Sequence, residues 1–415
     1  MNDYIPGGWY DAGDTLKLNF PLSTSVSTIG WGMIDFKESY VRVGKLSEAM
    51  ETIRVPLQYL YDSLNMDQGL YVGAIGIPYI DHNYWGRPSQ QGDLDRPPAI
   101  YNLSMAAADL YAASSAALST GYEIFKDSDP SFAENLKAAA IYLYEWGSRT
   151  GGTYSRYYTY VTASTYPSNS FEDDLSWAAG WLYRITGDAK YLTEALVHWS
   201  KAFPNVYSRW DSFFGQHAAH MVSLSDRGVA VPGIGFYQDF LDNKYFKAWL
   251  QADGFQSVIS TPLNMAYPGW SMWGNEAYST TAAAVAAVVA KYTPDQGKKS
   301  MLLNFAREQT DYALGSKTRS YVVGYGFNPP DQPHHAAASC PDVPLPCGWN
   351  DFSNPNPNPQ IIYGALVAGP GGALVNLQDP DNSFVNIRSD YVTNEVSVDY
   401  NAGFTTVLAA LYELV

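Results

Sequence analysis

Apolar residues recur at helical spacing along most of the 415-residue chain, and this periodicity constrains its fold more than any other feature. Over residues 46–60 the apolar side chains share one helical face, although we expect Pro56 to kink that helix. Similar patterns predict helices around residues 22–42, 100–121, 131–147, 172–187, 190–202, 212–225, 235–252, 277–292, 298–314 and 404–411. Because no convincing run of alternating strand residues accompanies them, the sequence predicts an all-α protein with about eleven helices.

Four connections between the predicted helices are unusually long, at residues 67–99, 148–171, 254–275 and 315–396. Loops of that length inside a compact domain usually carry function. Short connections alternate with these long ones, which is typical of helix pairs arranged in a ring. No stretch has the character of an interdomain linker, so we expect a single domain over residues 1–415.

The composition narrows the classes of partner. The chain has 25 basic and 41 acidic residues, a formal net charge of −16, which would repel a phosphate backbone or an anionic membrane. The most apolar stretch, residues 282–290, falls well short of the ~20 residues that span a bilayer. We therefore expect neither nucleic acid nor a membrane as a partner. Aromatic residues reach 15%, which excludes a disordered chain.

Two cysteines, Cys340 and Cys347, lie in a proline-rich stretch. We expect a local disulfide between them, and two free thiols are the alternative. A zinc site would need further ligands, for which His334 and His335 are the nearby candidates. A disulfide would indicate an oxidising compartment.

Three segments concentrate polar groups that could carry chemistry. The segment GGWYDAGD brings Asp11 and Asp14 together if glycine permits a tight turn, which suits water activation, metal binding or a plain Asx turn. Glu395, ahead of the last predicted helix, is either a helix-capping group or a buried acid. His334 and His335 lie in a stiff loop, where such a pair is more often structural or exposed than catalytic.

Taken together, these segments resemble glycoside hydrolase family 9. The similarity covers GGWYDAGD at 7–14, SYVVGYGFNPPDQPHH at 320–335 and SDYVTNEVSVDYNAGF at 389–404, with shorter matches at 81–86, 177–184 and 311–315. The SCPD loop from Ser339 and the ending just after the last helix look most like the animal branch. The resemblance implies inverting cellulase chemistry on an (α/α)6 barrel, whose long loops form a substrate cleft on one face. That barrel has twelve helices, so our lower count leads us to expect one that lacks its first helix.

The resemblance also implies roles for individual residues. Asp14 matches the catalytic base, Asp11 the residue that helps to hold the attacking water, and Glu395 the general acid. An inverting hydrolase needs its two carboxyl groups roughly 6.5–9.5 Å apart, with room for water between them. Because the acid must stay protonated, we expect a buried Glu395 with a raised pKa. His334 matches an active-site histidine that donates a hydrogen bond to sugar hydroxyls.

Further positions match the family's substrate and metal sites. Aromatic and imidazole rings expected to contact sugar are His82, Trp85, Tyr166, Trp273 and Tyr278. For any one of these aromatic residues, plain core packing is the alternative. Residues expected to bind a structural calcium ion are Asp173, Asp174 and Asp211. An acidic cluster at a helix start is the alternative for the first two, and the chemistry itself needs no cofactor.

Two positions depart from the family pattern. An arginine usually follows two residues after the active-site histidine, where this chain has Ala336, so we expect weaker substrate binding near the cleavage point. An aspartate usually stands nine residues before the acid, where this chain has Asn386, and this loss of charge should alter the tuning of Glu395.

The leading hypothesis is an endo-acting β-1,4-glucanase that inverts the anomeric centre. No separate carbohydrate-binding module is visible, so soluble or amorphous chains are the expected substrates. The alternatives are a catalytically impaired, carbohydrate-binding or structural relative, and a different specificity such as lichenan, glucomannan or exo-acting release. The family also implies a secreted protein, although this sequence shows no signal peptide, and we expect a monomer whose partner is β-glucan.

Overall fold

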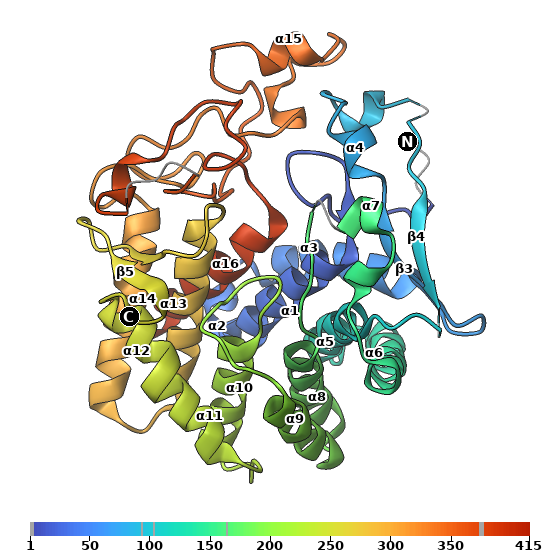
Figure 1. The fold of residues 1–415 in the computed structure, drawn as a ribbon, viewed down its shortest axis with the longest axis vertical. Helices are drawn as coiled ribbons and strands as arrows, with labels where there is room; N and C mark the ends of the chain where they lie inside the picture. The colour runs from blue at the N-terminus through green and yellow to red at the C-terminus, as the bar shows by residue number, and fades with distance from the viewer. Residues whose placement is uncertain (1–3, 93, 103, 163–164, 373–376) are drawn as a thin grey trace.

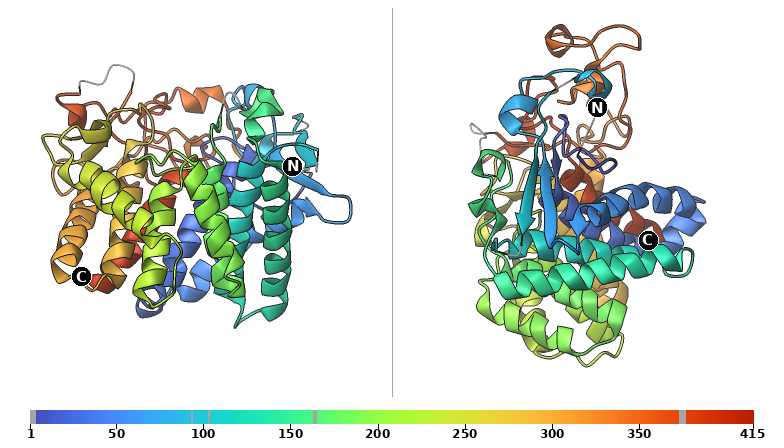
Figure 2. Two further views of the ribbon diagram at one scale, coloured as in Figure 1. Left: turned by 60° about the horizontal axis from the view of Figure 1, so that its bottom comes forward. Right: turned by 90° about the vertical axis from the view of Figure 1, so that its right-hand side faces the viewer.

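The computed structural model describes residues 4–92, 94–102, 104–162, 165–372 and 377–415. Long helices fill the lower part of Figure 1, and long loops gather above them with the short helices α4 (Pro78–Asp81) and α15 (Trp349–Phe352). Figure 2 shows the same division from two further sides. The loops therefore cover one end of a helical body.

Six helices form an inner ring, in which each contacts the next and the last contacts the first. They are α1 (Asn19–Asp35), α5 (Ala108–Phe125), α8 (Glu172–Thr186), α10 (Phe214–Asp226), α13 (Asn275–Tyr292) and α16 (Val398–Leu414). Helix α13 is buried at every residue from Asn275 to Ala290, as expected for a helix with small and apolar residues on all sides. The apolar core thus lies inside the ring and between the two layers.

Outer helices alternate with the inner ones along the chain. They are α3 (Leu46–Asp62), α6 (Pro130–Thr150), α9 (Lys190–Lys201), the pair α11 (Ile234–Phe240) and α12 (Phe246–Gln251) joined by a π-helical turn (Leu241–Tyr245), and α14 (Gln296–Ala313). Each outer helix follows its inner partner after a connection that is short compared with the loop leading to the next inner helix. This arrangement confirms the predicted all-α (α/α)6 barrel.

The sixth position of the outer layer differs from the other five, because a short helix occupies it in place of a long one. Between α16 and α1, the described residues place only the short helix α2 (Lys37–Arg42). Two cavities of about 610 and 480 Å³ lie along this side. Residues of α1, α2, α3 and α16 line the larger, and residues of α2 and α16 line the smaller. The ring thus has five long outer elements for six inner helices within the described part, which matches our count of eleven.

Close backbone approach ties the inner helices together. A Cβ atom added to Gly403 of α16 would lie 2.2 Å from Oγ1 and 2.5 Å from Cα of Thr281 in α13. Only glycine therefore fits at this crossing. This contact holds α16, and with it the segment that precedes α16, against the ring.

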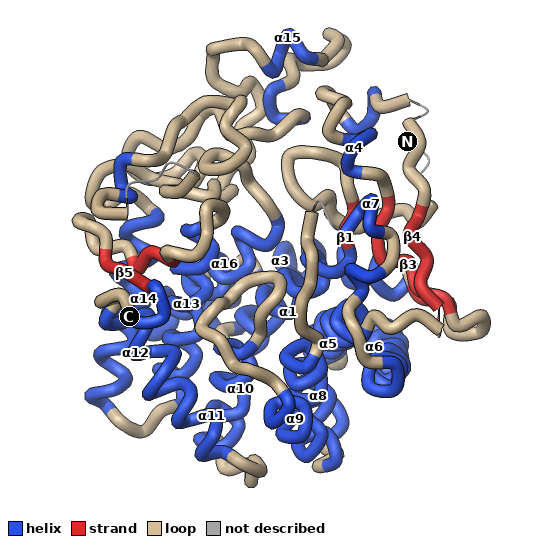
Figure 3. The backbone as a smooth tube through the Cα atoms, viewed as in Figure 1, coloured by secondary structure: helices blue, strands red, loops and turns tan. Residues whose placement is uncertain are grey.

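The sequence analysis missed the strands, which Figure 3 shows in red. Strands β1 (Lys17–Leu18), β2 (Leu64–Asn65) and β4 (Pro98–Asn102) each pair antiparallel with β3 (Leu70–Ile75), and β5 (Val258–Ser260) pairs with β6 (Ala266–Pro268). Such short strands leave too few residues for alternation to register. The helix expected at 100–121 accordingly begins only at Ala108.

The remaining short elements lie in the loops. They are α7 (Thr159–Thr162) and 3-10 turns at Pro88–Gln90, Tyr154–Arg156, Phe255–Ser257, Ala337–Ser339 and Pro380–Asn382. Cys340 and Cys347 form the expected disulfide. In the portion of the chain that the structure describes, no helix combines the length and the apolar character needed to cross a membrane.

Candidate active site

The segment with Asp11 and Asp14 forms a tight turn just ahead of β1. The Asp11 N–H donates to the carbonyl of Leu16 at 2.9 Å, and the Leu16 N–H donates to Asp14 Oδ1 at 3.0 Å. A Cβ atom on Gly13 would lie 2.6 Å from the His334 carbonyl oxygen, so the glycine is needed for the turn to pack there. Two segments more than 300 residues apart in the sequence thereby meet.

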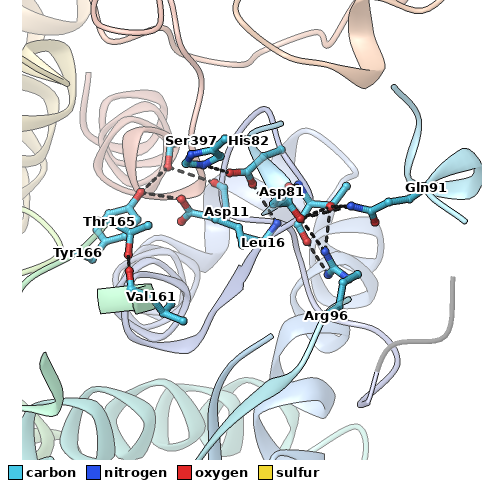
Figure 4. Close-up of polar contacts among 12 residues, drawn as sticks. Asp11, Leu16, Asp81, His82, Gln91, Arg96, Val161, Thr165, Tyr166 and Ser397 are labelled. Carbon is cyan, nitrogen blue, oxygen red and sulfur yellow. Dashed lines mark hydrogen bonds and ion pairs between the residues drawn. The ribbon is translucent and has the colours of Figure 1, made fainter. Parts of the chain in front are cut away.

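Asp11 is buried, with 7% of its surface exposed. The hydroxyl of Tyr166 donates to its Oδ2 at 2.9 Å, a contact drawn in Figure 4. Its Oδ1 lacks a hydrogen-bond partner among the described residues. Burial, followed by the nearby charges of Asp14 and Asp399, raises the pKa of Asp11 well above its usual range. The free oxygen is thus available to accept a hydrogen bond from a water molecule.

Asp14 has a different environment. His82 Nε2 lies 3.0 Å from Asp14 Oδ2, and the His82 side chain is 54% exposed. This hydrogen bond is the main reason why the pKa of His82 is raised. On the other side of the turn, Arg96 and the Thr15 hydroxyl both bond Asp81, which anchors α4 beneath His82 (Figure 4). Asp14 is therefore a positioned carboxylate at the solvent-accessible side of the turn.

Glu395 lies next to His334 through a parallel backbone bridge. The His334 N–H donates to the Asn394 carbonyl at 2.9 Å, and the Ala368 N–H donates to the Glu395 carbonyl at 2.9 Å. Burial is the largest cause that raises the pKa of Glu395 well above its usual range, followed by the charges of Asp14 and Asp11. Helix α16 begins only at Val398, so the capping interpretation is wrong, and Glu395 is a half-buried acid with a raised pKa.

The tautomer of His334 follows from its contacts. Nδ1 lies 2.7 Å from the carbonyl oxygen of Arg388, which can only accept, so Nδ1 carries a hydrogen. Burial lowers the pKa of His334, which favours the neutral ring. Neutral His334 then presents Nε2 as an acceptor. The geometry thus favours an acceptor role toward a sugar hydroxyl in place of the donor role that we expected.

Comparisons with known proteins identify the family of the chain. The family model described as glycosyl hydrolase family 9 matches residues 2–408. The chain belongs to this family. It is 33% identical to endoglucanase B of Cellulomonas fimi over 99% of its own length. It spans 38% of that relative and 54% to 62% of three further curated endoglucanases, from two Bacillus sources and from Dictyostelium discoideum.

Solved structures of the family superpose closely. The endoglucanase of the termite Nasutitermes takasagoensis gives a TM-score of 0.88 at 33% identity, covering 98% of this chain and 88% of that one. The endoglucanase CelQ of Clostridium thermocellum, complexed with cellotetraose, gives 0.82 at 29% identity, covering 100% and 64%. The barrel is therefore shared across the full length of the chain.

Sequence reasoning missed a buried arginine between the carboxylates. Arg209 donates through Nε and Nη2 to Asp399 Oδ2, at 2.9 and 2.6 Å. Ser397 Oγ donates to Asp399 Oδ1 at 2.7 Å and to the Asp11 carbonyl at 3.2 Å. The positive charge of Arg209 lowers the pKa values of Asp11 and Glu395, against the effect of burial. No local pattern marks Arg209, because its partner lies in the last helix.

The rings matched to the family's substrate site differ in how far they are exposed to solvent. Trp273 is 43% exposed and packs against Tyr391. Trp85 is only 7% exposed, and its Nε1 donates to Ser339 Oγ at 2.8 Å. Tyr278 is buried beneath the guanidinium of Arg209. Substrate contact by these residues, and by His82 and Tyr166, stays a prediction.

Asp173 and Asp174 lie buried in the first turn of α8, as the helix-start interpretation requires. The Phe213 N–H donates to Asp173 Oδ2 at 3.1 Å, and both residues have an Oδ1 atom without a partner in the described residues. With Asp211, however, they do not form a group of three ligands arranged for a metal within the part that the structure describes. Calcium binding stays a prediction.

The two departures from the family pattern have structural roles here. Ala336 is buried, and its N–H donates to the Gly13 carbonyl at 2.8 Å. Asn386 Nδ2 donates to Asp331 Oδ1 at 2.7 Å, and its Oδ1 accepts from the N–H groups of Asp331 and Gln332. Asn386 thereby holds the segment that leads to His334.

Proposed function

We propose that this protein hydrolyses internal β-1,4-glucosidic bonds of cellulose or a related glucan, with inversion at the anomeric carbon. The contrast between Glu395 and Asp14 carries the proposal. The raised pKa of Glu395 suits a proton donor. Asp14 accepts a hydrogen bond from the Leu16 N–H and lies 3.0 Å from Nε2 of His82, whose pKa this contact raises, and this setting suits a general base.

The reaction balances on these groups. Glu395 gives its proton to the leaving glycosidic oxygen as the bond to the anomeric carbon breaks. A water molecule forms the new bond from the opposite face and gives its proton to Asp14. Asp11, fixed by Tyr166, accepts a hydrogen bond through Oδ1 from the second hydrogen, which stays on the oxygen and becomes part of the new hydroxyl group. Neutral His334 accepts a hydrogen bond from a sugar hydroxyl and so orients the ring at the cleavage point.

The relatives support the substrate class. Several of them are named endoglucanases, and the CelQ structure contains cellotetraose. The rival hypothesis, an impaired carbohydrate-binding relative, draws on Ala336 and Asn386. Against it, Asp11 and Asp14 share one turn, and both lie close enough to Glu395 for their charges to raise its pKa.

The decisive test measures both rate and stereochemistry. Wild-type protein should release reducing ends from carboxymethylcellulose, and proton NMR of early products from cellopentaose should show the α-anomer first. Glu395→Gln should remain folded and lose this activity. A folded wild type that binds cello-oligosaccharides without cleaving them would favour the rival, and an initial β-anomer would exclude inversion.

A structural calcium ion near Asp173, Asp174 and Asp211 is part of the proposal. Burial is the main cause that raises the pKa of Asp174 well above its usual range, and Asp173 and Asp109 add to it. A cation would offset this repulsion, with backbone oxygens or water supplying the remaining ligands. Chelation should then lower the melting temperature, and added Ca²⁺ should restore it. An unchanged melting curve would leave only the helix-start interpretation.

Localisation and oligomeric state complete the proposal. The disulfide between Cys340 and Cys347 supports an oxidising compartment, in keeping with a secreted enzyme. We propose that the protein acts as a monomer on β-glucan chains. Gel filtration with light scattering would test the second point.

A further inference from the structure

A half-exposed tryptophan, Trp349, has no assigned role and lies on the far side of Trp85 from His334. Trp349 in α15 packs its ring 5.8 Å from that of Trp85, centroid to centroid, at an angle of 36°. The Trp85 ring lies 5.1 Å from that of His334. Trp85 is 7% exposed and Trp349 is 49% exposed. The ring that meets solvent on this side of His334 is therefore Trp349, with Trp85 underneath.

The loop that carries Trp349 is built to hold it. The disulfide between Cys340 and Cys347 cross-links the chain just before Trp349. The Gly348 N–H donates to Asp351 Oδ2 at 2.8 Å. Phe352 packs its ring 5.3 Å from that of Trp349 and 4.8 Å from that of Trp85. A large apolar ring is thus held in place while half of it stays in water, which a purely structural residue does not require.

Arg388 links this loop to the catalytic histidine. Its side chain is buried and donates to the carbonyl oxygens of Asp351 and Asn356 at 2.8 Å each, and to Asn358 Oδ1 at 2.7 Å. Its own carbonyl oxygen accepts the Nδ1–H of His334 at 2.7 Å. One residue therefore fixes both the Trp349 loop and the ring at the cleavage point. Their separation is set by hydrogen bonds that are buried or partly buried.

We propose that Trp349 is a sugar-stacking platform that binds a β-1,4-linked pyranose ring of the glucan, beyond the sugar at His334. A pyranose presents a face of C–H groups, and an indole ring offers a matching apolar surface of large area. The inference rests on the proposed function for its substrate class. Trp349 is a binding residue only, since two ring contacts separate it from His334.

The test separates this contact from the chemistry. In the Glu395→Gln background, calorimetry would measure the dissociation constants of cellotriose, cellotetraose, cellopentaose and cellohexaose. Trp349→Ala should weaken the binding of the longer ligands by about tenfold, a usual loss when a large aromatic contact is removed from a binding surface, and leave the binding of ligands too short to reach it unchanged. Trp349→Phe should recover part of the affinity. Phe236→Ala, at a 65% exposed ring of α11, which lies at the opposite end of the molecule from α15 in Figure 1, is the matched control.

The outcomes are distinct. Equal affinity of Trp349→Ala and its parent for cellohexaose would overturn the inference. So would a loss that is the same at every ligand length, because that pattern reports a disturbed His334 rather than a missing platform. Failure of every cello-oligosaccharide to bind would also overturn the inference. Binding that depends on Trp349 in a protein that never cleaves glucan would instead refute the proposed function and keep the platform.

Discussion

The hydrogen bond between Tyr166 and Asp11 gives a quantitative test of the site. Replacing Tyr166 with Phe removes the donor to Asp11 Oδ2 and leaves the other carboxylate oxygen as it was, without a partner in the described residues. Leaving a buried polar group unsatisfied costs about 1–3 kcal/mol, more for a charged one. Since 1.36 kcal/mol equals one pKa unit, the pKa of Asp11 should rise by about 1–2 units.

The sign of the effect follows from the direction of the shift. The pKa of Asp11 is already raised, and the Tyr166 hydrogen bond lowers it, so Tyr166→Phe should raise it further. In the proposed reaction Asp11 must be ionised to hold the attacking water beside the base Asp14, so its titration contributes to the acidic limb of kcat/KM, which should move up by about 1–2 pH units. The basic limb, which we assign to the raised pKa of Glu395, should stay in place.

Stability gives an independent measurement. A carboxyl with a raised folded pKa favours folding at low pH, and this contribution is lost as the pH rises through the folded pKa. The melting temperature of Tyr166→Phe should therefore match wild type near pH 4 and fall below it at higher pH. Tyr142→Phe, which removes a surface hydroxyl bonded to the Met66 carbonyl, should show neither effect. An unmoved acidic limb in a folded Tyr166→Phe protein would refute the assignment of Asp11.

Three further outcomes are expected. Glu395→Gln and Asp14→Asn should each lower kcat on glucan by ~10²–10⁴-fold, and a good leaving group should rescue only Glu395→Gln, so rescue of both would contradict the assignments. Gly403→Ala should lower the free energy of unfolding by about 1–3 kcal/mol in urea titrations, because its Cβ would clash with α13; a neutral result would show that the helices move apart. Leu408→Gln, at a 38% exposed position where α16 lines the smaller cavity, should change the free energy of unfolding by less than about 0.5 kcal/mol. Leu302→Gln, at a fully buried position of α14, should lower it far more. Equal losses would mean that other residues cover this side of α16.

The barrel could be predicted because its helices repeat a local pattern. The sequence predicts α3 and α14 within a few residues, since apolar residues on one face and polar residues on the other fix both type and extent. The strands around β3 could not be predicted, because they are stabilised by pairing partners distant in the chain. Pro56 lies inside α3, which continues through it to Asp62.

The candidate site likewise contains residues that the sequence predicted and residues that it did not. The carboxylates proposed as catalytic were identified through long motifs that this chain shares with its family. Arg209 and Trp349 were not, because each acquires its role from a partner brought close only by folding. The role of His334 also needed the structure, since only its contact with the Arg388 carbonyl fixes the tautomer.

The crowding of acids explains why Glu395 should hold the proton. Asp11, Asp14 and Asp399 all raise its pKa, and Arg209 is the positive charge that opposes them. That guanidinium is engaged by Asp399, Tyr166 donates to Asp11, and Asp14 accepts from the Leu16 N–H beside His82. Within the described residues, no group donates a hydrogen bond to the Glu395 carboxyl. Of these carboxyl groups, Glu395 has the least stabilised ionised form. The one proton that relieves the repulsion therefore resides on Glu395, which gives it to the leaving oxygen in the proposed reaction.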